Sequence, residues 1–309
     1  MSTNQAVGTG TVRRALEGRR VDVAGHVFTG VLLFSLLFTL GILAVLVGDQ
    51  LQRGLPVLLE RGSDVLTSPL SSRPDRAGVG QGIVGTALLA VMVAVLAFPI
   101  GILTAVYLEE YAPANRMTRF IDVNIRNLAG VPSVVYGLLG LAAFVSIFAS
   151  LGVGNGRNIL SGGLTLAVLV LPLVIITSAE AIRAVPIAIR EAGYGIGASR
   201  WQVVRQLVLP YAAPGILTGT VLALSRAIGE TAPLILAGAV LGSFSSGGGL
   251  DDLFGGSYTA LPIIVFDWAR KPQDEFRALA SAAILVLLAT TILANAIAIF
   301  LRTRYDRRW

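Results

Sequence analysis

Three residue types are absent or nearly absent from the 309 residues, and each absence excludes a class of chemistry. The chain has no cysteine, which excludes disulfide bonds, thiolate catalysis and cysteine-ligated metal sites. Its one histidine, His26, stands at the start of an apolar run, where we expect an interfacial side chain rather than a metal ligand. Its one lysine, Lys271, follows an arginine, so the Gly-Lys pair of a Walker A loop does not occur. We therefore expect that this chain binds no metal, no nucleotide and no other cofactor.

Charge is also scarce, and it is distributed as in a membrane protein. Only 14% of the residues are charged and 54% are hydrophobic, with a mean hydropathy of +0.76, which is typical of an integral membrane protein. The net charge of +6 comes from arginines that flank apolar runs and do not form one basic face. This pattern favours the positive-inside rule over nucleic-acid binding. We expect membrane lipid, and no nucleic acid, around this chain.

The apolar runs predict six membrane-spanning helices, because a span needs about 20 apolar residues at about 1.5 Å per residue. Residues 1–26 are a polar N-terminal tail, residues 27–47 the first span and residues 48–81 an external loop. Residues 82–301 hold five further spans, and residues 302–309 are the C-terminal tail. The expected limits of the spans are 27–47, 82–108, 128–151, 160–181, 213–241 and 278–301.

The arginines predict how these spans are oriented. Six spans leave fifteen basic residues on the side of the two tails and eight on the other side, and Arg226 is the remaining one of the 24. Basic residues are enriched on the cytoplasmic side of membrane proteins. We expect both termini in the cytoplasm.

A charged pair inside the fifth span is the first candidate site. Arg226 and Glu230 are four residues apart in an apolar run, which places both on one face of a continuous helix. Charged residues inside a membrane are costly and usually functional. The functional reading is that Arg226 and Glu230 line a path for a charged solute, with Ser225 and Thr231 as hydroxyl donors. The alternative is an ion pair that only holds two helices together.

The polar segment of residues 182–212 is the second candidate site. It contains Glu191-Ala192, Gly197 and Leu209-Pro210 at the spacing of the cytoplasmic "EAA loop", and so resembles that of ABC importer permeases. Gly193 and Leu207 depart mildly from the family pattern. In that family the loop forms two short helices that meet at the glycine and dock in a cleft of the ATPase subunit. The resemblance implies that residues 182–212 are a coupling segment; the alternative is an amphipathic helix lying on the membrane.

The sequence around Arg226 resembles a narrower family. Arg226-Ala227-Ile228-Gly229-Glu230-Thr231 is similar to a signature of phosphate-specific transport (Pst) permeases, and Thr231-Ala232-Pro233 resembles the A subunit more than the C subunit. Further matching pieces are residues 107–112, 127–137 and 259–262. The resemblance covers roughly residues 80–305.

This resemblance implies an all-α polytopic membrane protein with six transmembrane helices and the type I ABC importer permease (MetI-like) fold. It implies a non-catalytic permease subunit for phosphate in the bacterial plasma (inner) membrane. The implied partners are a C-type permease, two ATP-hydrolysing subunits and an extracytoplasmic phosphate-binding protein. A permease for sulfate, molybdate or phosphonate and a secondary transporter are the alternatives.

Overall fold

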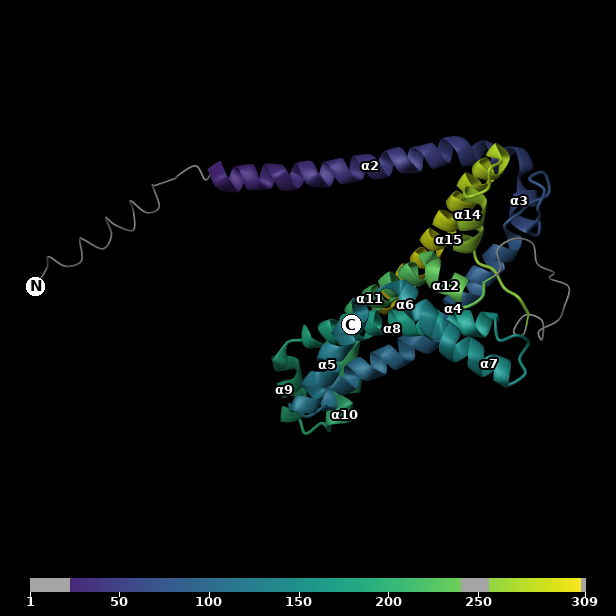
Figure 1. Ribbon diagram of the computed structural model, residues 1–309. Coiled ribbons are helices and arrows are strands. Elements are labelled where there is room, and N and C mark those ends of the chain that lie inside the picture. The colour runs from purple at the N-terminus through teal and green to yellow at the C-terminus, as the bar shows by residue number, and fades with distance from the viewer. Residues whose placement is uncertain (1–22, 240–255, 307–309) are drawn as a thin grey trace, which may run out of the picture. The chain divides into compact units, whose positions relative to one another are not determined.

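The structure, a computed structural model, describes residues 23–239 and 256–306, and every regular element in them is a helix (Figure 1). Six helices in this part are long and apolar enough to cross a membrane, which confirms the predicted number. The chain divides into two units, residues 1–49 and 50–309. The six helical stretches are Val23–Arg61, Gly80–Tyr111, Ser133–Ser150, Ile159–Arg183, Arg200–Gly229 and Asp274–Phe300.

The first helix, α2 (Val23–Arg61), is longer than the predicted span of residues 27–47. It continues through residues 48–61 of the predicted external loop of residues 48–81, which also holds the short helix α3 (Ser63–Thr67). Leu51, Leu55 and Leu58 recur at helical spacing there, so the helix does not end where charges begin. Polar residues mark the end of an apolar run, but they do not mark the end of a helix.

The remainder of the predicted external loop packs into a small apolar cluster. Arg61 donates hydrogen bonds to the carbonyl oxygens of Pro74 and Ala77, both at 2.8 Å, and so holds this loop on the end of α2. The cluster also includes α14 (Leu261–Ala269), too short to cross a membrane, and the start of α15 (Asp274–Asp306). At its centre the rings of Trp268 and Phe276 lie 6.0 Å apart.

The core of residues 50–309 is built around α8 (Ile159–Arg183), the most buried of the six spans. α4 (Gly80–Val106) packs along it, followed by one π-helical turn, η1 (Tyr107–Tyr111). Close backbone approach is a feature of this core: a Cβ at Gly85 of α4 would overlap the carbonyl oxygen of Thr259. Small residues permit such contacts in membrane proteins.

The third span is interrupted at its start. α5 (Arg116–Ala129) ends before Gly130-Val131-Pro132, and α6 (Ser133–Gly140), η2 (Leu141–Val145) and α7 (Ser146–Ser150) follow. The span therefore begins about five residues later than the predicted position 128, because a proline disfavours helical backbone in the residue before it. The Tyr136 hydroxyl donates to the Leu128 carbonyl oxygen at 2.8 Å and bridges the interruption.

The fifth span begins earlier and ends earlier than the predicted residues 213–241. α10 (Arg200–Val203), the π-helical turn η3 (Val204–Val208) and α11 (Leu209–Gly229) form one continuous helix with Pro214 inside it. After a break comes α12 (Ala232–Leu236). Residues 240 and 241 of the predicted span lie outside the described residues. Along residues 50–309, α9 (Ile187–Gly195) and α10 lie at one end and α3 and α14 at the opposite end (Figure 1).

Candidate functional site

The candidate site at Arg226 lies where α11 ends. The backbone of Glu230 is extended, with φ −75° and ψ 131°, so the helix stops at Gly229. Pro233 is the second residue of α12, where a missing N–H costs nothing; in a continuous helix its ring would instead clash with the carbonyl group of Gly229, four residues earlier. The expectation that Arg226 and Glu230 share the face of one continuous helix is therefore wrong, since only Arg226 is helical.

The two charges nevertheless meet across the break. Arg226 Nε lies 3.3 Å from Glu230 Oε1. The arginine side chain is 47% exposed and the glutamate side chain 17%, so the carboxylate is the more enclosed partner. Ala227 and Ile228 point into the core, which leaves Arg226 on the outward side of the last turn. Part of the guanidinium is thus accessible from outside this chain.

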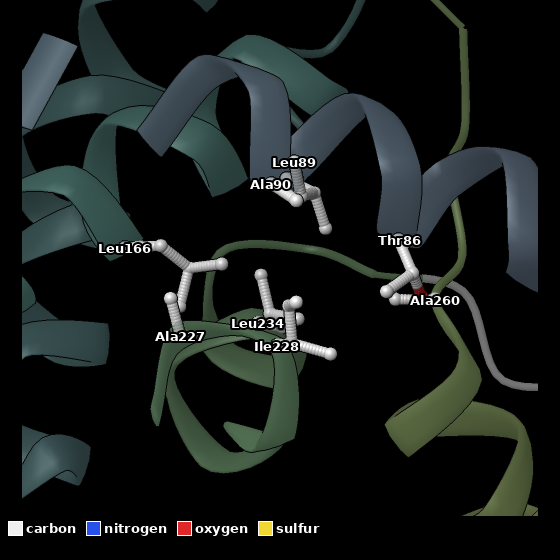
Figure 2. A pocket seen from close by; sticks show the side chains of 8 residues that line it. All are labelled: Thr86, Leu89, Ala90, Leu166, Ala227, Ile228, Leu234 and Ala260. Atoms are coloured by element: carbon white, nitrogen blue, oxygen red, sulfur yellow. The ribbon is translucent and has the colours of Figure 1, made fainter. Parts of the chain in front are cut away.

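Behind Arg226 the core holds a small apolar pocket (Figure 2). Its only hydroxyl belongs to Thr86, and that oxygen accepts a hydrogen bond from the Leu261 amide at 2.9 Å. A lining without charge does not suit an oxyanion, so a charged solute would meet Arg226 on its outward side. The lining residues are Thr86, Leu89, Ala90, Leu166, Ala227, Ile228, Leu234 and Ala260.

The two predicted hydroxyl donors differ in their surroundings. Ser225 Oγ lies 2.8 Å from the Val221 carbonyl oxygen and 2.7 Å from Asn295 Oδ1 of α15. A serine hydroxyl has one proton, so the Ser225 proton is used within the protein, where it links α11 to α15. Thr231 precedes α12 and is half-buried beside Glu230. Of the two, Thr231 remains the better candidate for a solute contact.

Tyr136 is a neighbour of this site to which the sequence assigned no role. It lies on α6, is 6% exposed, and is within electrostatic range of Arg226. α6 packs on α12 so closely that a Cβ at Gly137 would lie 2.7 Å from Pro233 Cα. The motif of residues 127–137 and the motif around Arg226, 90 residues apart in sequence, thus form one structural unit.

The second candidate site, the coupling segment, folds as two helices with a tight turn between them. Gly197 occupies the turn with φ +82°, a left-handed conformation that favours glycine. The amides of Gly197 and Ala198 donate to the carbonyl oxygens of Tyr194 and Gly193. Ser199 and Gln202 then form a capping box that starts α10. The second helix is not short, because α10 continues through η3 into the fifth span.

The departures from the family pattern have a packing explanation. A Cβ at Gly193 would lie 2.8 Å from both Val203 Cγ2 and Leu207 Cδ1, so glycine here lets α9 approach η3 closely. Leu209 and Pro210 begin α11 and are half-buried. Glu191 and Ala192, by contrast, are exposed on α9. The pattern residues therefore divide into an exposed group on α9 and at the turn, and a packed group at the start of α11.

An exposed apolar surface surrounds this turn. Ile196, directly before Gly197, is 86% exposed, and Ile187 is 69% exposed. Tyr194 and Trp201 are about half exposed on the same segment. Large apolar side chains exposed close together in sequence favour an interaction surface over a solvated one.

Comparisons with known proteins identify the family of this chain. Residues 97–309 match the family described as binding-protein-dependent transport system inner membrane component. The chain is 35% identical over 233 residues to the phosphate transport system permease protein PstA 1 of Mycobacterium tuberculosis, covering 74% of this chain and 72% of that protein.

Two solved structures share the fold. A chain of an alginate ABC transporter, in complex with its alginate pentasaccharide-bound periplasmic protein, has a TM-score of 0.60 at 14% identity and covers 89% of this chain and 95% of that one. A chain of the MetNI methionine ABC transporter has a TM-score of 0.56 at 16% identity. The match covers 74% of this chain and 95% of that one. The chain therefore belongs to the binding-protein-dependent transport system inner membrane component family and is a multi-pass membrane protein with the MetI-like permease fold.

Proposed function

We propose that this chain is the A-type permease subunit of an ATP-driven phosphate importer. The observation that carries the proposal is the half-exposed Arg226 at the break between α11 and α12, held by Glu230 at 3.3 Å. A planar guanidinium with free donors suits a tetrahedral oxyanion, which it can bind through two hydrogen bonds. The 35% identity to a phosphate transport system permease supports phosphate as the solute.

In the proposed path, phosphate binds Arg226 on the outward side of α11. Glu230 stays paired with the arginine and limits how tightly phosphate is held, because a conduit must also release its solute. The hydroxyl of Thr231 adds a donor. Ser225 contributes indirectly, by tying α11 to α15 through Asn295.

The coupling segment supplies the energy link in this proposal. The exposed apolar surface around Ile196 docks on an ATP-binding subunit, together with Glu191 and Ala192 of α9. ATP binds and is hydrolysed on two copies of that subunit, while this chain catalyses no reaction and holds no cofactor. The other partners are a C-type permease and an extracytoplasmic phosphate-binding protein.

The arrangement also supports an orientation in the bacterial plasma (inner) membrane. ATP-binding subunits are cytoplasmic, so the end that carries α9 and α10 faces the cytoplasm. With six spans, both termini would lie on that same side, which is also the side that the arginine distribution favours. The cluster of α3 and α14 then faces outward, towards the binding protein.

The proposal is tested with the complete complex in proteoliposomes. A hydrogen bond to a charged group contributes about 1.5–3 kcal/mol, so Arg226→Gln should reduce phosphate uptake roughly 10- to 150-fold. Arg226→Lys keeps the charge but loses the bidentate geometry, and should retain intermediate uptake. Co-purification of all subunits is the control for assembly. Unchanged uptake by an assembled Arg226→Gln complex would refute the path.

The same preparation separates phosphate from other oxyanions, which a guanidinium also binds. ATP hydrolysis should rise with phosphate-loaded binding protein and stay basal with empty protein. If a sulfate-loaded or molybdate-loaded binding protein stimulates hydrolysis and phosphate does not, the permease function stands and the assigned solute is wrong.

A further inference from the structure

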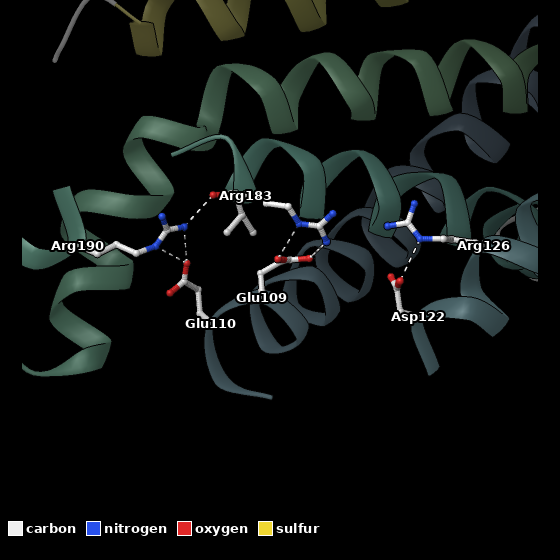
Figure 3. Close-up of polar contacts among 7 residues, drawn as sticks. Glu109, Glu110, Asp122, Arg126, Arg183 and Arg190 are labelled. Atoms are coloured by element: carbon white, nitrogen blue, oxygen red, sulfur yellow. Dashed lines mark hydrogen bonds and ion pairs between the residues drawn. The ribbon is translucent and has the colours of Figure 1, made fainter. Parts of the chain in front are cut away.

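Three consecutive residues of the π-helical turn η1 each contact an arginine of the coupling segment, two of them before Glu191 in sequence and one after it. Glu109 and Arg183 are paired at the end of α8, with Nε 3.2 Å from Oε2, and Glu110 binds Arg190 of α9 (Figure 3). The Arg200 guanidinium of α10 lies 5.1 Å from the centre of the Tyr111 ring. The three pairs are Glu109–Arg183, Glu110–Arg190 and Tyr111–Arg200. The end of α4 is thereby joined to α8, α9 and α10.

The Glu110–Arg190 pair is the most enclosed of these contacts. The side chains of Glu110 and Arg190 are 6% and 19% exposed. Arg190 Nε and Nη2 lie 3.1 and 2.9 Å from the same carboxylate oxygen. Nη1 and Nη2 also donate to the carbonyl oxygens of Val185 and Ile182, at 2.6 and 2.9 Å. One guanidinium thus joins the end of α4, the end of α8 and the start of α9, one residue before Glu191.

Burial makes this contact hard to separate. Parting a buried pair leaves an uncompensated charge in the protein, whereas an exposed pair exchanges its partner for water at little cost. Glu109–Arg183 is closer to the second kind, since the Arg183 side chain is 55% exposed and only Glu109, at 18%, is enclosed. A displacement of α9 is therefore transmitted to α4 through Glu110 more firmly than through Glu109.

A second connection leaves α9 in another direction. Gly193 of α9 packs on Val203 and Leu207, so α9 also contacts the helix that leads to Arg226. Movement of α9 consequently reaches two spans: the fifth span by apolar packing, and α4 by the buried ion pair. The two connections start from neighbouring positions on α9, Arg190 and Gly193, but run to different elements, so they can be altered separately.

We propose that the Glu110–Arg190 pair is the link through which movement of the coupling segment reaches α4, and with it the α4–α8 core. Both are positioning residues, since neither lies at the solute path around Arg226 or on the exposed surface around Ile196. The pair makes α4 move with α9 when an ATP-binding subunit pulls on the turn. This inference rests on the proposed function, because it specifies how the proposed coupling crosses the chain.

The test measures phosphate moved per ATP hydrolysed in the complete complex. Glu110→Gln keeps the shape of the side chain and removes the charge, so ATP-binding subunits should still co-purify and hydrolysis should continue. Phosphate moved per ATP should fall tenfold or more. Glu109→Gln is the matched control, an identical change one residue away, and should stay within about twofold of the unaltered complex. Full coupling in Glu110→Gln, or an equal loss in Glu109→Gln, would overturn the proposal.

A second variant covers failure of the first to assemble. Arg190→Lys keeps the charge opposite Glu110 and loses the bonds to the carbonyl oxygens of Ile182 and Val185. It should assemble and lose at least threefold in phosphate moved per ATP; full coupling in an assembled Arg190→Lys complex contradicts the link. Loss of assembly in both variants also contradicts it, because the pair would then serve folding. An unaltered complex that moves no phosphate would instead refute the proposed function.

Discussion

The turn at Gly197 leads to the sharpest prediction, because the structure separates two effects of adding a side chain. A Cβ at Gly197 would meet no atom within 4 Å, so steric overlap plays no part. The backbone φ of +82°, however, is unfavourable for a residue with a Cβ, at a cost of about 1–2 kcal/mol. That energy corresponds to a factor of roughly 5 to 30. Gly197→Ala should weaken docking of the ATP-binding subunit by up to that factor.

Two variants isolate the cause. Gly195→Ala makes the same change two residues earlier, also in open space, in a helical residue outside the left-handed region, and should leave docking unchanged or slightly stronger. Gly197→Asn adds a larger side chain that tolerates left-handed backbone, and should bind better than Gly197→Ala.

The measurement is a titration of the ATP-binding subunit onto the permease pair in nanodiscs, with the dissociation constant as readout. If Gly197→Ala, Gly197→Asn and Gly195→Ala all bind alike, the backbone argument is wrong. If Gly197→Asn is the weakest of the three, side-chain size decides docking and conformation does not.

Two further predictions concern packing between spans. Ser225→Val removes the hydrogen bond to Asn295 Oδ1 and should lower the free energy of unfolding of the purified permease by roughly 0.6–1.7 kcal/mol. Ser225→Thr retains a hydroxyl and should keep the stability of the unaltered permease. Equal stability of the two variants would show that the bond contributes nothing. Gly85→Ala places a Cβ on the carbonyl oxygen of Thr259 and should lower the free energy of unfolding by about 1–3 kcal/mol. In Gly130→Ala the new Cβ meets only the Asn127 carbonyl oxygen, at 3.5 Å, and the melting temperature should not change. Equal melting temperatures of the two variants would contradict the packing argument.

Composition was sufficient to predict the number of spans, because the membrane core requires long apolar helices. The ends of the spans were less predictable. α2 continues to Arg61 because leucines at helical spacing extend the helix beyond the uncharged stretch, between polar residues. α11 stops at Gly229, inside an apolar run, because Pro233 disrupts the helix although hydrophobicity continues. Hydropathy indicates which residues favour the interior of a membrane, but it does not indicate where a helix is broken.

The two charged pairs also differ in how well the sequence predicts them. Arg226 and Glu230 were identifiable as charges in an apolar run, and their contact follows from proximity in the chain. Glu110 and Arg190 are 80 residues apart and lie in segments with many charges, so nothing local distinguishes them from solvated residues. The signal that Glu110 is enclosed exists only in the packing of η1 against α8 and α9. Long-range pairs of this kind require the fold.

The continuous helix Arg200–Gly229 has a mechanical consequence. It runs from Trp201, on the exposed surface around the turn, to Arg226 at the break, and two of its residues, Pro210 and Pro214, lack an N–H; Pro214 is the one near its middle. At 1.5 Å per residue, the arm from Arg200 to Pro214 is about 21 Å and the arm from Pro214 to Arg226 about 18 Å. Arms of nearly equal length transmit displacement almost one to one. If the helix turns about Pro214, a movement of a few ångströms at Trp201 in the proposed importer would therefore reach Arg226 nearly unchanged in size.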